Sequence, residues 1–204
     1  MAPNKSTTVA GITFNLQAAP QLSVLGDWVL DTLVKMKQGG AALQDGSRIQ
    51  LGWSMLTLVE QQPRSYIVCE PDFEGNPFED LRPNVDKTLI GQTMLNEFST
   101  MVNIVPVFPS FQDKVVFEKG CLDSTEVFMN RSSPQQGDSG WFIGYKERSN
   151  DGRSLEAIYV YDLFNRRSDL FPALALPPGY VVISEGRGIK AVLDEQDQVA
   201  WSDS

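Results

Sequence analysis

One short stretch of the sequence has the residue types of a nucleophilic serine site. Gly137-Asp138-Ser139-Gly140 places a serine after an acidic residue and between glycines, which is the setting of the nucleophile in one large class of serine proteases. A serine hydroxyl becomes reactive only when a neighbouring base takes its proton, and in those enzymes the base is a histidine. The 204-residue chain contains no histidine, and nothing in the sequence points to a buried lysine that could replace one. The sequence therefore argues against a serine hydrolase.

The same residues have a structural interpretation. Gly137 and Gly140 bracket a tight turn, and the short side chains of Asp138 and Ser139 can hydrogen-bond to nearby backbone amides. Trp141 then begins a strand. We expect Asp138 to hold the turn, Trp141 to be mostly buried, and Ser139 to be a turn residue rather than a nucleophile.

A second candidate site is the acidic stretch 70–83, which contains five carboxylates, three prolines and one glycine. Its alternating oxygen-bearing side chains suggest a calcium loop. However, the positions that need glycine and glutamate in an EF-hand loop hold Pro77 and Pro83. We therefore expect no metal site and no cofactor.

Aromatic side chains lie among these carboxylates, and an exposed aromatic residue surrounded by charge is typical of a protein interface. The sequence thus predicts a partner-binding loop made of Asp72, Phe73, Glu74, Phe78, Glu79 and Asp80. A second acidic group near the C-terminus, Asp194, Glu195 and Asp197, is a further candidate for partner contacts.

Composition limits the kinds of partner. The chain has 26 acidic and 17 basic residues, a net charge of −9. Direct nucleic-acid binding needs clustered Lys and Arg and is not expected, whereas an acidic surface suits a basic protein partner or simply keeps a protein soluble. Cys69 and Cys121 form no CxxC motif, and they could form one disulfide or stay reduced. No apolar run is long enough for a membrane helix, and the N-terminus does not have the pattern of a secretory signal, so we expect a cytoplasmic location.

The first half of the chain mixes helices and strands. Apolar residues that alternate with polar ones predict a strand, and an apolar stripe at three- and four-residue steps, which includes Trp28, predicts a helix. The expected elements are a polar, frayed segment 1–10, strands at 12–17, 48–61 and 64–71, and helices at 20–38 and 84–103, the second capped by Asn84.

The second half is rich in strand patterns. We expect strands at 114–120, 126–131, 140–146, 156–163, 180–186 and 189–195, with the last two joined by a turn at Gly186-Arg187-Gly188. The sequence therefore predicts an α+β fold, in which a mixed N-terminal half precedes a strand-rich, mainly antiparallel C-terminal half. A composition shift places the expected boundary near residue 113, between an N-terminal region 1–113 and a C-terminal domain 114–204.

Three segments in order resemble one family. Asp138-Ser139-Gly140-Trp141, Tyr161-Asp162-Leu163 and Leu176-Pro177-Pro178-Gly179-Tyr180 resemble a DSGW turn, a "YDL" element and an "LPPGY" loop of the Imm33 type of bacterial immunity protein. The resemblance covers about residues 125–200, somewhat under half of the chain. The first half matches no motif and could determine the choice of partner.

The resemblance implies a protein that is not an enzyme. Immunity proteins of polymorphic toxin and type VI secretion systems bind a cognate toxin and block its active site or substrate groove. The expected partner is then a toxin with a basic surface, which agrees with the acidic composition. Two alternatives stay open: a small acidic binding module for a peptide or a secretion component, and an enzyme that uses carboxylates in an apolar cleft.

Overall fold

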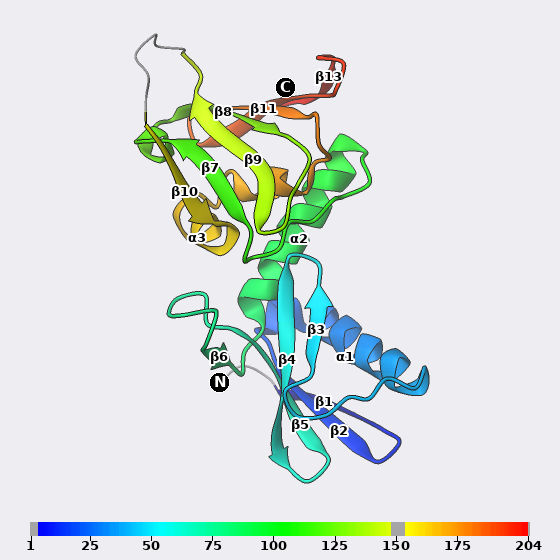
Figure 1. Cartoon of the computed structure of the whole chain (residues 1–204). Coiled ribbons are helices and arrows are strands. Elements are labelled where there is room, and N and C mark those ends of the chain that lie inside the picture. The colour runs from blue at the N-terminus through cyan, green and yellow to red at the C-terminus, as the bar shows by residue number, and fades with distance from the viewer. Residues whose placement is uncertain (1–3, 148–153, 204) are drawn as a thin grey trace. The chain divides into compact units, whose positions relative to one another are not determined.

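The computed structural model describes residues 4–147 and 154–203, which form two compact units, Met1–Gln92 and Thr93–Ser204. The boundary falls inside helix α2 (Asp86–Val102), whereas the composition shift in the sequence lies near residue 113. The fold is α+β, as expected, with strands dominating the second unit (Figure 1). No helix in the described part of the chain is long and apolar enough to cross a membrane.

The first unit is built on one mixed sheet. Its strand order is β1-β2-β5-β4-β3, and the short β6, which is not part of this order, pairs with the end of β5. The strands are β1 (Asn4–Val9), β2 (Ile12–Gln17), β3 (Arg48–Leu51), β4 (Ser54–Gln62), β5 (Ser65–Pro71) and β6 (Leu81–Arg82). The central pair β2–β5 is parallel, and the other neighbours are antiparallel.

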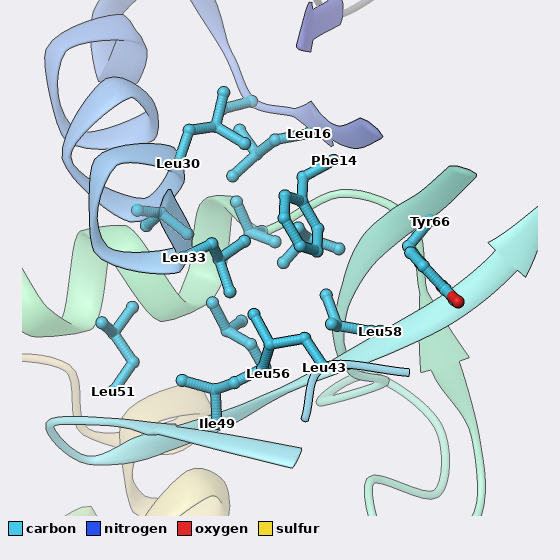
Figure 2. Packing of buried hydrophobic residues seen from close by; sticks show 14 of the residues in the cluster. Phe14, Leu16, Leu30, Leu33, Leu43, Ile49, Leu51, Leu56, Leu58 and Tyr66 are labelled. Atoms are coloured by element: carbon cyan, nitrogen blue, oxygen red, sulfur yellow. The ribbon is translucent and has the colours of Figure 1, made fainter. Parts of the chain in front are cut away.

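Helix α1 (Ser23–Gln38) covers this sheet, after a 3-10 turn η1 (Pro20–Leu22). Its stripe Val29, Leu30 and Leu33 is buried against Phe14, Leu16 and the side chains of β3 and β4 (Figure 2). The helix approaches β2 closely because Gly26 has no side chain: a Cβ there would lie 3.1 Å from Leu16 Cδ2. The opposite face of α1 is exposed to solvent. Trp28 lies on this face and is 48% exposed, so the expectation that it belongs to the buried apolar stripe is wrong.

Two further expectations for this unit need correction. Residues 4–9 form edge strand β1 rather than a frayed end, because every residue of β1 pairs with β2. The expected strand 48–61 is a hairpin, in which Gly52, at φ +56°, turns the chain between β3 and β4. The strand at 12–17 and the helix over 20–38 are confirmed.

The second unit contains a seven-stranded sheet of order β10-β7-β9-β8-β11-β12-β13. All neighbouring pairs are antiparallel except β7–β9, which confirms the mainly antiparallel expectation. Its strands are β7 (Lys114–Glu118), β8 (Glu126–Arg131), β9 (Asp138–Tyr145), β10 (Leu155–Tyr159), β11 (Val181–Glu185), β12 (Gly188–Leu193) and β13 (Val199–Ser202). The expected turn at 186–188 joins β11 to β12, and β13 had no counterpart in the sequence analysis.

Short helical segments complete the core of this unit. Helix α3 (Val160–Arg166) and the 3-10 turn η3 (Phe171–Ala175) supply the buried Leu163, Phe171 and Leu174, and a further 3-10 turn η2 (Cys121–Asp123) follows β7. The expected strand 156–163 is therefore half wrong: only residues 155–159 are a strand. The helix begins at Val160, directly after the last β10–β7 pair, Tyr159 with Lys114; the Val160 N–H still donates to Asp113 O at 2.9 Å in the same register.

Candidate functional site

Ser139 lies at a bulge where β9 pairs with β7. Lys114 is paired with Asp138, but Val116 is paired with Phe142, so β9 carries two extra residues between these points. The Ser139 hydroxyl compensates for the interrupted ladder: it donates to Lys114 O at 2.7 Å and accepts from Trp141 N at 3.2 Å. Its side chain is fully buried. This geometry uses both functions of the hydroxyl for the backbone, so Ser139 is a structural residue.

The rest of the motif serves the same bulge. Asp138 Oδ1 accepts a hydrogen bond from Gly140 N at 2.9 Å, which confirms that Asp138 holds the turn. Gly140 has φ +77°, and a Cβ there would lie 2.2 Å from Ser132 O. Trp141, 1% exposed, is buried as expected, and its indole N–H donates to Leu174 O at 3.1 Å.

A buried arginine that sequence reasoning missed ties these segments together. Arg131 at the end of β8 is 2% exposed, and its guanidinium donates to four backbone carbonyls, those of Val107, Ser139, Leu174 and Leu176. Burial lowers the pKa of Arg131 to about 10, so it stays charged at neutral pH. Among the described residues it forms no ion pair; the carbonyl dipoles and the Trp141 ring, 5.6 Å away, replace one.

A second buried arginine lies at the end of α3. Arg167 is 1% exposed and forms a bidentate ion pair with Asp169, with N–O distances of 2.7 and 2.9 Å. Its remaining donors bind the carbonyls of Leu122 and Ser124 near η2. Arg131 and Arg167 thus hold the loops of this unit, and no signal in the sequence distinguishes them from surface arginines.

The acidic loop of the first unit is built around an aromatic anchor. Phe73, expected at the surface, is 2% exposed and stacks on Trp53 with ring centroids 4.9 Å apart. The expectation that Phe73 is an exposed contact residue is therefore wrong. Its neighbours pair internally: Arg82 binds Asp72 at 2.7 Å and Glu74 at 2.6 Å. The hydrogen bond and charge of Arg82 lower the pKa of Glu74. Asp72 also accepts hydrogen bonds from the N–H groups of Glu74 and Gly75, both at 3.1 Å.

The other predicted residues of this loop are at its surface. Phe78 and Leu81 are each 43% exposed, and Glu79 and Asp80 between them are exposed too. Neither carboxylate takes part in an ion pair in the part of the chain that the structure describes. The backbone is fixed by hydrogen bonds from the N–H groups of Glu79 and Asp80 to Asn76 O, and from Asp72 N to Asp80 O. Of the four predicted carboxylates, Asp72 and Glu74 are therefore in the described ion-pair network and Glu79 and Asp80 are not, and of the two predicted aromatic residues Phe78 is exposed.

A buried carboxylate lies at the base of the loop. Glu70 is 4% exposed, and its oxygens accept hydrogen bonds from the first-turn N–H groups of Lys87 and Thr88 in α2, at 3.3 and 2.7 Å. Burial raises the pKa of Glu70 to about 7. A cleft of about 230 Å³ opens beside it, lined by Glu70, Phe73, Glu74, Arg82, Asn84, Asp86 and Lys87.

A carboxylate of raised pKa in a cleft is what a carboxylate-based enzyme would need. Both oxygens of Glu70, however, accept hydrogen bonds from N–H groups at the start of α2, which have no partner within the helix. We therefore assign Glu70 to capping α2. The expected cap Asn84 accepts from Asp86 N at 2.8 Å and shares this role. Among the described residues, no group of three or more His, Cys, Asp or Glu side chains could hold a metal ion.

The second acidic group forms the turn between β12 and β13. Asp194 Oδ1 accepts from Gln196 N and Gln198 N, both at 2.9 Å, and Asp197 adopts φ +58°. Glu195 lies against Gly179 of the Pro-Pro-Gly-Tyr loop, since a Cβ on Gly179 would lie 2.9 Å from Glu195 Cβ. Burial, together with the charges of Asp194 and Glu195, raises the pKa of Tyr180.

Comparison with known proteins identifies the family of most of the second unit. A family model described as an Imm33-like domain matches residues 94–195, half of the chain. No curated protein and no solved structure matched the chain significantly. The match contains the Ser139 bulge, both buried arginines and all but the last strand of the sheet.

Proposed function

The chain belongs to the Imm33-like family, an immunity-protein family, and on this basis we propose that it binds and neutralises a cognate antibacterial toxin. The family match to residues 94–195 is the observation that carries the proposal. It covers most of the second compact unit, Thr93–Ser204, so the similarity extends over most of a folded unit rather than a short motif.

The chemistry of the two reactive-looking side chains supports a binding role. Ser139 bridges two strands through its hydroxyl, and Glu70 caps a helix through its carboxylate. Each group uses its donors or acceptors to hold the fold, which agrees with a protein that acts through its surface. We therefore propose inhibition by occlusion of the toxin's active site or substrate groove.

Charge supports the choice of a basic target. The chain carries −9, and an acidic inhibitor gains association rate and specificity when it meets a cationic groove. Toxins that act on nucleic acids have such grooves, so we propose a target of this kind, delivered by a type VI or related secretion system. We place the encounter in the cytoplasm, where free thiols such as Cys69 and Cys121 are common.

Co-expression tests the proposal. The protein encoded next to this gene is expressed alone, together with the full chain, and together with the Gly140→Ala chain, which we expect not to fold. We expect growth arrest alone, growth with the full chain and arrest again with the variant. A neighbour that is not toxic, or a toxic neighbour whose effect persists with the full chain, would refute the proposed function.

A further inference from the structure

We propose that residues 78–81, here called the loop tip, contact the toxin, and that the rest of the acidic loop holds the tip in its binding conformation. The inference rests on the proposed function and adds to it the surface and the kind of partner: a basic protein surface with an apolar recess. It divides the predicted contact residues into two groups. Phe78, Glu79 and Asp80, together with Leu81, bind, whereas Asp72, Phe73 and Glu74 support.

The supports preorganise the tip. Phe73 is buried on Trp53, and Arg82 clamps the loop by ion pairs to Asp72 and Glu74. The β5–β6 pairing closes the loop and fixes Leu81, the last residue of the loop tip, opposite Pro71. A binding loop that is already ordered loses less conformational entropy on association, and this entropy is one of the main terms opposing affinity.

Charge favours a basic partner at the tip. The negative charges of Asp72 and Glu74 are balanced by Arg82, and Lys87 lies 3.6 Å from Glu74. Glu79 and Asp80 have no such counter-charge among the described side chains, and the tip contains no basic residue. The local charge of the loop is therefore concentrated at the tip.

The apolar part of the tip gives it an anchor. Phe78 and Leu81 flank the two carboxylates in sequence and are each 43% exposed. An aromatic residue that becomes fully buried at the centre of an interface, ringed by charged residues, is the common form of a binding hot spot. The partner should therefore offer an apolar recess for Phe78 with basic residues at its rim.

Another exposed aromatic residue of the same unit provides a matched control. Trp28 on α1 is 48% exposed, but the adjacent Asp27 pairs with Lys5 at 2.5 Å, and Lys35 lies two turns further along the same helix. Aromatic exposure there is not combined with a concentrated negative charge. Asp31 on this helix is exposed and allows the same change of charge as Asp80.

The experiment measures the affinity of the full chain for the neighbouring gene's protein, inactivated at its catalytic site, by calorimetry at low and high salt. We expect Phe78→Ala to weaken binding at least about 30-fold, as for a hot-spot residue. Asp80→Lys should weaken it at least about tenfold and reduce its dependence on salt. Trp28→Ala and Asp31→Lys should change the affinity by less than about twofold, the usual range for residues outside a hot spot. Circular dichroism confirms that each variant is folded.

The possible outcomes separate the inference from the function on which it rests. If the full chain binds and rescues growth, but the tip variants bind as well as the wild type, the inference is wrong and the proposed function stands. Equal losses of affinity in the loop-tip variants and in the α1 variants would also overturn the inference, since they would show that binding depends only on the overall charge of the protein. If the full chain neither binds nor rescues, the proposed function fails and takes the inference with it.

Discussion

Replacing Ser139 with alanine tests whether this serine holds the fold. The change removes one fully buried hydroxyl that donates to Lys114 O at 2.7 Å and accepts from Trp141 N at 3.2 Å. A net hydrogen bond contributes about 1 kcal/mol, and a buried polar group left without a partner costs about 1–3 kcal/mol. Ser139→Ala leaves the Lys114 carbonyl and the Trp141 N–H at the bulge without this hydrogen-bond partner. We therefore expect a loss of about 2–4 kcal/mol in the free energy of unfolding.

Urea unfolding followed by circular dichroism and by tryptophan fluorescence measures this loss. The matched control is Ser132→Ala, whose exposed hydroxyl donates to Gly140 O at 3.1 Å while the same carbonyl also accepts from Ser132 N at 2.9 Å. Water can replace that exposed bond, so the control should lose less than about 1 kcal/mol. Under conditions where both variants are folded, each should bind the toxin within about twofold of the wild type, because neither changes the loop tip.

Two results would refute this reasoning. A Ser139→Ala protein as stable as the Ser132→Ala control would show that the hydroxyl does not support the bulge. A Ser139→Ala protein that is stable but has lost a hydrolytic activity of the wild type would restore the serine as a nucleophile.

Three further changes test other parts of the structure. Gly140→Ala should prevent folding, since its Cβ would lie 2.2 Å from a backbone oxygen, whereas Gly137→Ala, at φ +75° with open space around it, should cost about 1 kcal/mol in thermal unfolding. The pKa of Glu70 is raised from 4.5 to about 7, so the native state binds an extra proton between these values and loses stability as pH rises. Wild-type stability should therefore fall by about 3 kcal/mol from this group between pH 4.5 and 7.5, and Glu70→Gln should have a correspondingly flatter pH profile. Asp169→Asn should lower the urea midpoint, with a loss of about 3 kcal/mol, because it leaves the 1% exposed Arg167 without its counter-charge.

Each of these has a clear contrary outcome. Equal thermal stabilities of the two glycine variants would show that the Gly140 contact is not limiting. Parallel pH profiles of the wild type and Glu70→Gln would show that Glu70 titrates normally, and an unchanged urea midpoint for Asp169→Asn would show that the buried arginine finds other partners.

Elements with a regular apolar pattern could be predicted from the sequence. Strand 12–17 was found at its exact bounds because Ile12, Phe14 and Leu16 alternate with polar residues and all three are buried. The helix over 20–38 followed from its apolar stripe and its glycine end. In both cases most of the apolar residues that form the pattern are also packed in the core, so the pattern alone predicts the element.

Elements defined by distant partners could not be predicted. Strand β1 is polar and exists through its pairing with β2. The hairpin at Gly52 divides a stretch that has the residue pattern of one strand, and α3 begins where the β10–β7 pairing ends and Tyr161 N donates to Phe111 O. The partner of α3, Phe111, is distant in sequence. The partners within the β3–β4 hairpin are close in sequence, but the residue pattern does not show where the chain turns.

The sequence predicted the acidic loop as the candidate site, but not which of its residues are buried and which are exposed. Phe73 and Phe78 occupy similar acidic surroundings in the sequence, yet one is buried on Trp53 and the other is exposed. The choice depends on the position of Trp53 in the β3–β4 turn, which composition does not report. Arg131 likewise gave no signal, because its acceptors are backbone carbonyls rather than acidic side chains.

The carbonyl partners of Arg131 have a consequence for how sequences of this family can diverge. Every residue type has a backbone carbonyl, so the acceptors at Val107, Leu174 and Leu176 survive any substitution that leaves the chain path unchanged. The arginine has no such freedom, since only its planar guanidinium combines a fixed charge with several directed donors. Substitutions at the acceptor positions should therefore be limited only by packing, which at the buried Leu174 and Leu176 requires apolar side chains, whereas replacement of Arg131 removes the hydrogen bonds themselves, an asymmetry that a mutational scan would reveal.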